Sequence, residues 1–234
     1  MMSTYKPTRE LNFSEILEYS WNIYIEHAIK IALPYVILGI IGVILDKMQI
    51  SKSYITLEIV GVPVHRIYGY TIIDTIIQMI LSMIVAGMVI KYVGDLVEGG
   101  KPTLRSSLDY VVTRLLDIII ASIIFGTILI IGFILFIIPG IIFGIMFILT
   151  MQVVVLEGKN PIEALDRSRR LVSGRWALTF ILILILLILI LLANAIPIIG
   201  WILVMLVQSY MMVVLTMLYY SLKAREEHLP PQVI

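Results

Sequence analysis

The sequence predicts an all-α integral membrane protein, with six transmembrane helices arranged as three hairpins. Of its 234 residues, 60% are hydrophobic and 14% are charged, against roughly 45–50% and about 25% in soluble domains. The mean hydropathy is +1.05, and two long segments carry no charged residue. These observations exclude an ordinary soluble fold and predict a single membrane domain, residues 1–234.

The longer uncharged segment, 176–222, contains 47 residues. As one helix it would extend about 70 Å, more than twice the hydrocarbon thickness of about 30 Å. The chain must therefore fold back, and a proline and a glycine place the reversal at 194–200. This predicts spans near 177–194 and 201–221.

The second uncharged segment, 118–156, contains 39 residues and is also too long for one span. Pro139 and Gly140 predict a break that leaves spans near 118–138 and 141–156. Because Gly140 and Gly144 lie one helical turn apart, we expect them to allow close packing against a neighbouring helix of this chain.

The first pair of spans is predicted at 29–45 and 71–93, with a kink at Pro34 in the first of them. The polar loop between them, 46–70, lies outside the cell in the predicted topology. It contains two β-rich stretches separated by a glycine and a proline. We expect this loop to form a small β-hairpin.

A short amphipathic segment precedes each pair of spans, and the three segments align on Leu17, Leu108 and Leu165, each followed by an acidic residue. Apolar residues recur there at helical spacing, which predicts helices in the membrane interface. The units are 12–97, 103–156 and 161–222, followed by a cytoplasmic tail, 223–234. We expect a pseudo-threefold repeat, and chance similarity between amphipathic helices is the alternative.

The distribution of basic residues predicts the orientation. Of seventeen Lys and Arg residues, the loops on one side carry Lys47, Lys52 and Arg66, and the other fourteen lie in the termini, the opposite loops or the adjoining helix ends. Under the positive-inside rule, both termini are cytoplasmic in a multi-pass protein of the cell membrane.

The run 156–176, together with the opening 11–17 and the break at 138–140, resembles a family of prokaryotic membrane domains. That family includes the membrane domain attached to some glycerophosphodiester phosphodiesterases, and also stand-alone six-span chains. The resemblance implies a six-span fold. It implies no catalysis, because the phosphodiesterase reaction belongs to a separate soluble barrel that this chain lacks.

The residues themselves favour a protein that is not an enzyme. His27, His65 and His228 fall in three separate segments, and the chain has no cysteine. Motifs for metal hydrolysis, nucleotide binding and acyl transfer are absent. We therefore predict no catalytic residue, no metal and no cofactor.

Four polar residues lie within predicted spans and form a candidate polar path: Asp74, Gln78, Gln152 and Gln208. Ionisable residues in spans are costly and often functional. Alternatively, Asp74 lies near enough to the interface to be hydrated, and the glutamines join helices through hydrogen bonds.

The densest basic cluster is the candidate contact for lipid head groups: Arg167, Arg169, Arg170 and Arg175. Basic residues beside a membrane attract anionic lipids by about 1 kcal/mol each. The alternative is ordinary helix salt bridges, from Glu163 to Arg167 and from Asp166 to Arg170.

These observations predict a non-catalytic membrane protein that contacts anionic lipids and scaffolds a membrane enzyme or transporter. The first alternative is a transporter or scramblase of a lipid or small solute, with a path near Asp74. The second is an intramembrane enzyme. The net charge of +1 gives no reason to expect nucleic acid as a partner, and the oligomeric state is left open.

Overall fold

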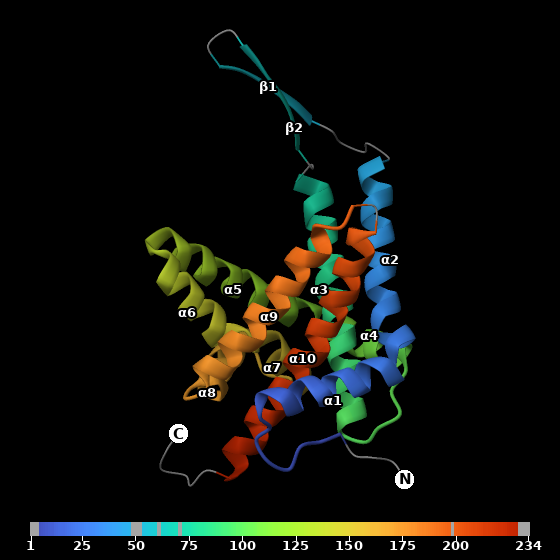
Figure 1. Ribbon diagram of the computed structural model, residues 1–234, viewed down its shortest axis with the longest axis vertical. Coiled ribbons are helices and arrows are strands. Elements are labelled where there is room, and N and C mark those ends of the chain that lie inside the picture. Colours follow the sequence, from blue (N-terminus) through green and yellow to red (C-terminus); the bar gives the residue numbers. More distant parts are fainter. Residues whose placement is uncertain (1–4, 48–52, 60–61, 70–71, 198, 229–234) are drawn as a thin grey trace.

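The computed structural model describes residues 5–47, 53–59, 62–69, 72–197 and 199–228. Ten helices and one two-stranded sheet form within these residues (Figure 1). In chain order the elements are α1 (Phe13–Glu26), α2 (Ala28–Lys47), β1 (Ser53–Ile59), β2 (Val62–Gly69), α3 (Ile72–Val97), α4 (Leu104–Thr113), α5 (Leu115–Leu135), α6 (Ile137–Phe147), α7 (Thr150–Glu157), α8 (Pro161–Val172), α9 (Trp176–Asn194) and α10 (Gly200–His228).

Six segments of the described chain are long and apolar enough to cross a membrane, which confirms the predicted six-span class. They are Ala28–Leu45, Thr75–Val97, Leu115–Leu135, Ile137–Glu157, Trp176–Asn194 and Gly200–Glu227. The fourth segment combines α6 and α7. Many of their large apolar side chains are exposed, as expected of surfaces that face lipid rather than water.

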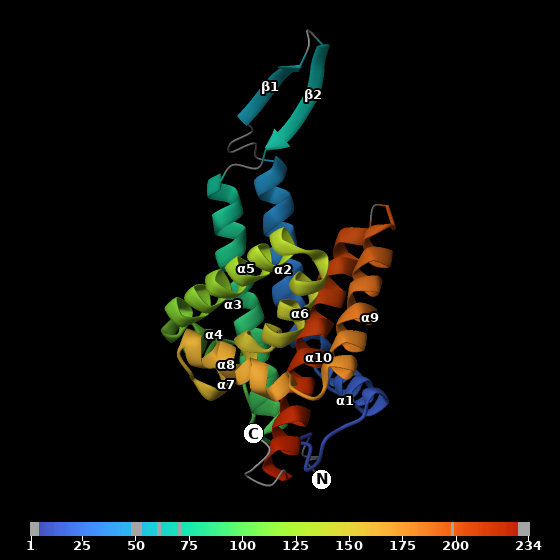
Figure 2. The same ribbon diagram turned by 90° about the vertical axis from the view of Figure 1, so that its left-hand side faces the viewer.

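Helix α10 forms the centre of the molecule. It contacts α1, α2, α3, α7, α8 and α9, and its side chains from Val213 to Leu218 are all buried. The pair α5 and α6 diverges from the other spans (Figure 1), and Figure 2 shows α5 crossing them obliquely. α5 is the least buried of the six spans.

The break between α5 and α6 lies at Phe136, and not at the predicted Pro139 and Gly140. Phe136 is extended, and α6 begins directly after it. Pro139 lies in the first turn of α6, where a missing N–H leaves no helical hydrogen bond unmade. The proline therefore marks the start of a helix and does not mark the turn.

Glycines allow α5 and α6 to pack closely, as the sequence predicts. A Cβ atom at Gly140 would lie 2.5 Å from the Phe133 ring, and one at Gly132 would lie 2.9 Å from the Cα of Gly140. A Cβ atom at Gly144 would contact Leu129 at 3.4 Å. Gly140 and Gly144 thus face a neighbouring helix within the chain.

The fourth span is interrupted between α6 and α7, and Ser168 of α8 occupies the interruption. Its hydroxyl donates a hydrogen bond to the carbonyl of Met146 (2.9 Å) and accepts one from the N–H of Leu149 (3.1 Å). These bonds satisfy backbone groups that a continuous helix would have paired internally. They also fasten α8 to the span.

The predicted β-hairpin is present. β1 and β2 pair in antiparallel register, from Ser53 opposite Gly69 to Ile59 opposite Val62, with an irregularity between Ile55 and Leu57. The hairpin lies at the end of the molecule opposite α1 and the C-terminal end of α10 (Figure 1).

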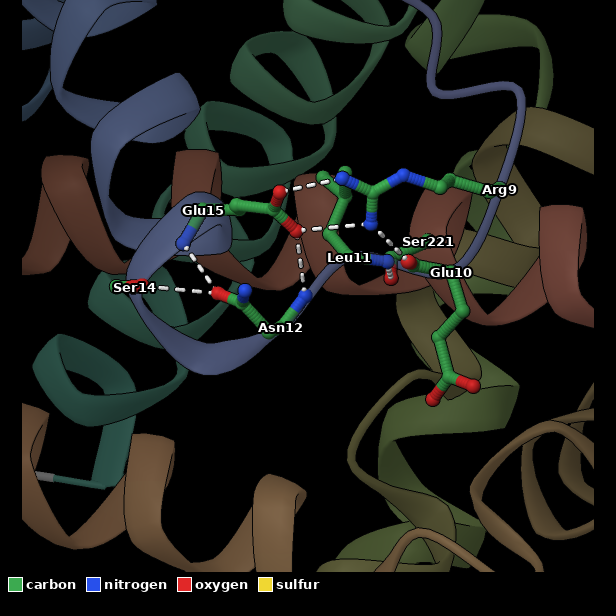
Figure 3. Close-up of polar contacts among 7 residues, drawn as sticks. All are labelled: Arg9, Glu10, Leu11, Asn12, Ser14, Glu15 and Ser221. Atoms are coloured by element: carbon green, nitrogen blue, oxygen red, sulfur yellow. Dashed lines mark hydrogen bonds and ion pairs between the residues drawn. The ribbon is translucent and has the colours of Figure 1, made fainter.

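The three amphipathic segments are helices α1, α4 and α8, and their N-caps are equivalent. The side chains of Asn12, Thr103 and Asn160 each accept a hydrogen bond from the backbone N–H three residues later. In each helix the aligned leucine lies five residues after the cap. At α1, Glu15 also bonds back to the N–H of Asn12, and the N–H of Leu11 donates to Ser221 of α10 (Figure 3).

Candidate functional site

The basic cluster predicted from the sequence lies on α8 and the turn that follows it. Asn160 caps this helix and Pro161 occupies its first turn, so both favour a start at this point. Ala164, Leu165, Ser168 and Leu171 are buried against the spans. This orientation turns Arg169 and Arg170 outward.

Arg167 points inward and forms an ion-pair network between three elements. Its Nε donates to Glu157 Oε1 of α7 (3.1 Å), and its Nη1 donates to Glu226 of α10. The Tyr219 hydroxyl also donates to Glu157 (2.9 Å). The prediction that Arg167 pairs with Glu163 is therefore wrong. Helix packing brings the guanidinium to Glu157 and Glu226 instead, and both of these carboxylates are less exposed than that of Glu163.

The environment of Arg167 keeps it charged. Burial alone would lower its pKa, but hydrogen bonds and charge interactions with Glu226 and Glu157 outweigh that effect, so the pKa is raised. The Arg167 side chain is 14% exposed. It joins helices and offers little surface to a lipid.

A cleft of about 570 Å³ lies beside this network, between α8, the start of α9 and the end of α10. Its lining carries three arginines, two acidic residues and several apolar side chains. The lining residues are Met146, Asp166, Arg169, Arg170, Leu171, Ser173, Trp176, Leu222, Arg225 and Glu226.

Three arginines supply the positive charge of this basic cleft. Arg170 pairs with Asp166 at 2.7 Å, in the i,i+4 arrangement that the sequence predicts. Arg169 is exposed and makes no ion pair within the described part of the chain. Arg225 Nη2 donates to the Ser173 carbonyl (3.0 Å), and its buried Nη1 has no hydrogen-bond partner among the described residues.

Gly174 shapes the wall of the basic cleft where Arg225 lies. Its φ of 77° lies in the left-handed region that favours glycine. A Cβ atom there would lie 3.1 Å from Arg225 Nη2. The glycine therefore allows both the turn after α8 and the close approach of the guanidinium.

The structure thus divides the four predicted arginines. Arg169 and Arg170 line the basic cleft, Arg167 is buried in the network, and Arg175 pairs with Glu10 of the N-terminal segment. Sequence reasoning missed Arg225, which falls in the predicted tail. The tail begins inside a helix, because α10 continues to His228. Helical continuation of the last span was the signal that could have revealed it.

The predicted polar path is not brought together as one site. Gln78 and Gln208 line a mostly apolar groove of about 660 Å³ between α2, α3 and α10, together with Thr75 and Ser82. Gln152 is buried on α7, in a different cavity. The Asp74 side chain lies outside the described residues.

Within the described residues, no group of three or more His, Asp or Glu side chains could hold a metal ion. The fold defines a multi-pass helical membrane protein. Residues 22–225 match the model of a family described as a domain of unknown function, DUF7847, and the chain belongs to that family. No curated protein and no solved structure matches it. The resemblance to phosphodiesterase-associated membrane domains stays a prediction.

Proposed function

We propose that this protein is a non-catalytic protein of the cell membrane that binds the head groups of anionic lipids in the basic cleft. The observation that carries the proposal is that Arg169 and Arg225 line the same cleft as the half-buried, apolar Trp176. Guanidinium groups suit phosphate oxygens, and an apolar wall suits the upper part of a lipid chain.

The orientation supports this role. If the positive-inside rule applies, the basic cleft faces the cytoplasm and the β-hairpin lies outside. α1 and the end of α10 lie together, opposite the hairpin, which agrees with that assignment (Figure 1). The basic cleft would then be placed at the cytoplasmic leaflet, where anionic lipids concentrate.

We also propose that the chain consists of three equivalent units, each an interfacial helix followed by a helical hairpin. The equivalent caps of α1, α4 and α8 support this. So does burial, because two sets of aligned residues are fully buried in all three helices. These sets are Ile16, Ser107 and Ala164, and Ser20, Val111 and Ser168.

The lipid proposal is tested by native mass spectrometry of the purified protein in detergent. The probes are dihexanoyl phosphatidylglycerol, dihexanoyl phosphatidylcholine and inorganic phosphate. We expect the phosphatidylglycerol to bind more tightly than the phosphatidylcholine, and free phosphate to bind weakly because it lacks the acyl chains. Arg169→Ala should weaken phosphatidylglycerol binding about fivefold, since one basic residue contributes about 1 kcal/mol.

Arg105→Ala is the matched control, because Arg105 is exposed on α4, the equivalent helix of the second unit. This variant should bind phosphatidylglycerol as tightly as the unaltered protein. Equal binding by the Arg169→Ala variant, or no preference between the two lipids, would contradict the proposal. Scaffolding of a membrane enzyme or transporter would be a further role of a membrane protein that binds lipid in this way.

The second candidate function is movement of a lipid or small solute along the groove between α2, α3 and α10. It is favoured by one observation, the presence of Gln78 and Gln208 in that same groove. In liposomes with a fluorescent phospholipid, transport would expose inner-leaflet label to an impermeant quencher. A Gln78→Leu, Gln208→Leu variant should then lose that activity, and protection equal to empty liposomes would exclude this candidate.

A further inference from the structure

The basic cleft contains two acidic side chains as well as its three arginines. Asp166 lies on α8 with Arg169 and Arg170. Glu226 follows Arg225 near the end of α10. A site that only had to attract a phosphate group would gain nothing from carboxylates, because like charges repel. The two acidic residues therefore indicate a second kind of contact with the ligand.

Each carboxylate is held by an arginine and can still accept another hydrogen bond. Asp166 Oδ2 lies 2.7 Å from Arg170 Nη1, and Glu226 Oε1 accepts a hydrogen bond from Arg167 Nη1. Within the described residues, Asp166 Oδ1 and Glu226 Oε2 have no such partner. The two side chains are 51% and 23% exposed. Since an ionised carboxylate can accept about four hydrogen bonds, both are accessible acceptors that ion pairs hold in place.

The charge of the lining discriminates between head groups. Three arginines and two carboxylates leave a net charge of +1 in the basic cleft. A phosphate diester carries one negative charge and balances it, whereas a phosphate monoester carries about −1.5 to −2 at pH 7. An added ammonium group would make the head group neutral and leave the charge of the cleft uncompensated. Hydroxyl groups donate hydrogen bonds to carboxylates without adding charge.

We propose that the basic cleft recognises a phosphate-diester lipid whose head group carries hydroxyl groups, as in phosphatidylglycerol. This inference rests on the proposed function and names the ligand class of that same site. The phosphate lies between Arg169 and Arg225, and the hydroxyl groups donate to Asp166 and Glu226. The volume of about 570 Å³ equals that of roughly nineteen liquid waters at about 30 Å³ each, which is enough for a glycerol phosphate group.

The test is native mass spectrometry of the purified protein in detergent with dihexanoyl lipids. Phosphatidylpropanol is the decisive comparison, because it has the phosphate diester and the single charge of phosphatidylglycerol but no head-group hydroxyl. We expect phosphatidylglycerol to bind about tenfold more tightly, which corresponds to about 1.4 kcal/mol for two hydrogen bonds. Phosphatidylethanolamine and phosphatidylcholine, which have no net charge, should bind more weakly than phosphatidylglycerol. So should glycerophosphoglycerol, which has the same head group without acyl chains.

The Asp166→Ala variant removes one of the two acceptors. It should reduce the preference for phosphatidylglycerol over phosphatidylpropanol to about threefold, the effect of one remaining hydrogen bond. This ratio isolates the hydroxyl contact, because both lipids have the same charge and gain equally from the released Arg170. Asp166 forms an exposed ion pair, so its removal should hardly affect folding. Asp109→Ala, at the aligned and exposed acidic residue of α4, is the matched control and should keep the full preference.

The outcomes separate this inference from the proposed function. Equal binding of phosphatidylglycerol and phosphatidylpropanol, with both above phosphatidylcholine, would overturn the inference and leave the lipid site in place. An unchanged ratio in the Asp166→Ala variant would also overturn it, as would phosphatidylethanolamine or glycerophosphoglycerol that binds as tightly as phosphatidylglycerol. If neither anionic lipid bound better than phosphatidylcholine, the proposed function would fail together with the inference.

Discussion

At the scale of single residues, charge pairing follows the packing of helices more than sequence spacing. Arg167 does not pair with Glu163, which lies one turn away on its own helix, but with Glu157 and Glu226. Those partners belong to α7 and α10, so the ion pairs join three elements. Buried ion pairs contribute little over apolar substitutes, but removal of one partner leaves an uncompensated charge.

We predict that Arg167→Ala lowers the free energy of unfolding by about 3 kcal/mol, because two largely buried carboxylates lose their counter-ion. Thermal or denaturant unfolding in detergent measures this. Arg169→Ala, on the same helix but exposed, should change the stability by less than about 0.5 kcal/mol. Similar stability of the two variants would show that the network contributes nothing.

The pH dependence of this contribution follows from the raised pKa of Arg167. A group whose pKa is higher in the folded state contributes fully below its unfolded pKa, and loses the contribution as the pH rises through its folded pKa. The unfolded pKa of arginine already exceeds 12. The cationic partner of the network therefore stays charged at every pH that the folded protein is expected to tolerate.

At the scale of elements, the packing of α5 against α6 depends on glycines that let the two helices approach. At Gly132, a Cβ atom would come within 2.8 Å of the Phe143 ring and 2.9 Å of the Gly140 backbone. The backbone of α6 is then the obstacle, and it moves less readily than a side chain. The sequence indicated this packing through Gly140 and Gly144, but it did not reveal their partner.

We predict that Gly132→Ala destabilises the protein by about 1–3 kcal/mol, the usual cost of overpacking. Gly126→Ala is the matched control in the same helix, because a Cβ atom there would meet nothing within 4 Å. That variant should be neutral or more stable, since alanine favours a helix by about 1 kcal/mol over glycine. Unfolding temperatures in detergent compare them, and equal losses would contradict close α5–α6 packing.

At the scale of the whole molecule, the elements outside the spans lie at two opposite ends. The amphipathic helices, the start of the chain and the end of α10 gather at one end, and β1 and β2 extend from the other (Figures 1 and 2). α10 lies between them and contacts α1, α2, α3, α7, α8 and α9. The orientation of the protein in the membrane can therefore be measured with one label at each end.

The chain has no cysteine, so one introduced cysteine is its sole thiol. We predict that Ser53→Cys, at the start of β1, reacts with an impermeant maleimide on intact cells. Ser14→Cys, exposed on α1, should react only after the cells are permeabilised. Labelling of Ser14→Cys in intact cells would contradict the proposed topology and would place α1 outside the cell.

The sequence by itself determined the six spans, because the free energy of transferring apolar segments into lipid depends on composition and length and hardly on neighbours. Periodicity likewise located the amphipathic helices, and hairpin signals located β1 and β2. Tertiary structure decided which polar groups of different elements meet. It placed Arg225 and Arg169 in the same cleft, separated Gln152 from Gln78 and Gln208, and turned Arg167 inward, because these positions depend on how different helices are rotated and tilted when they pack.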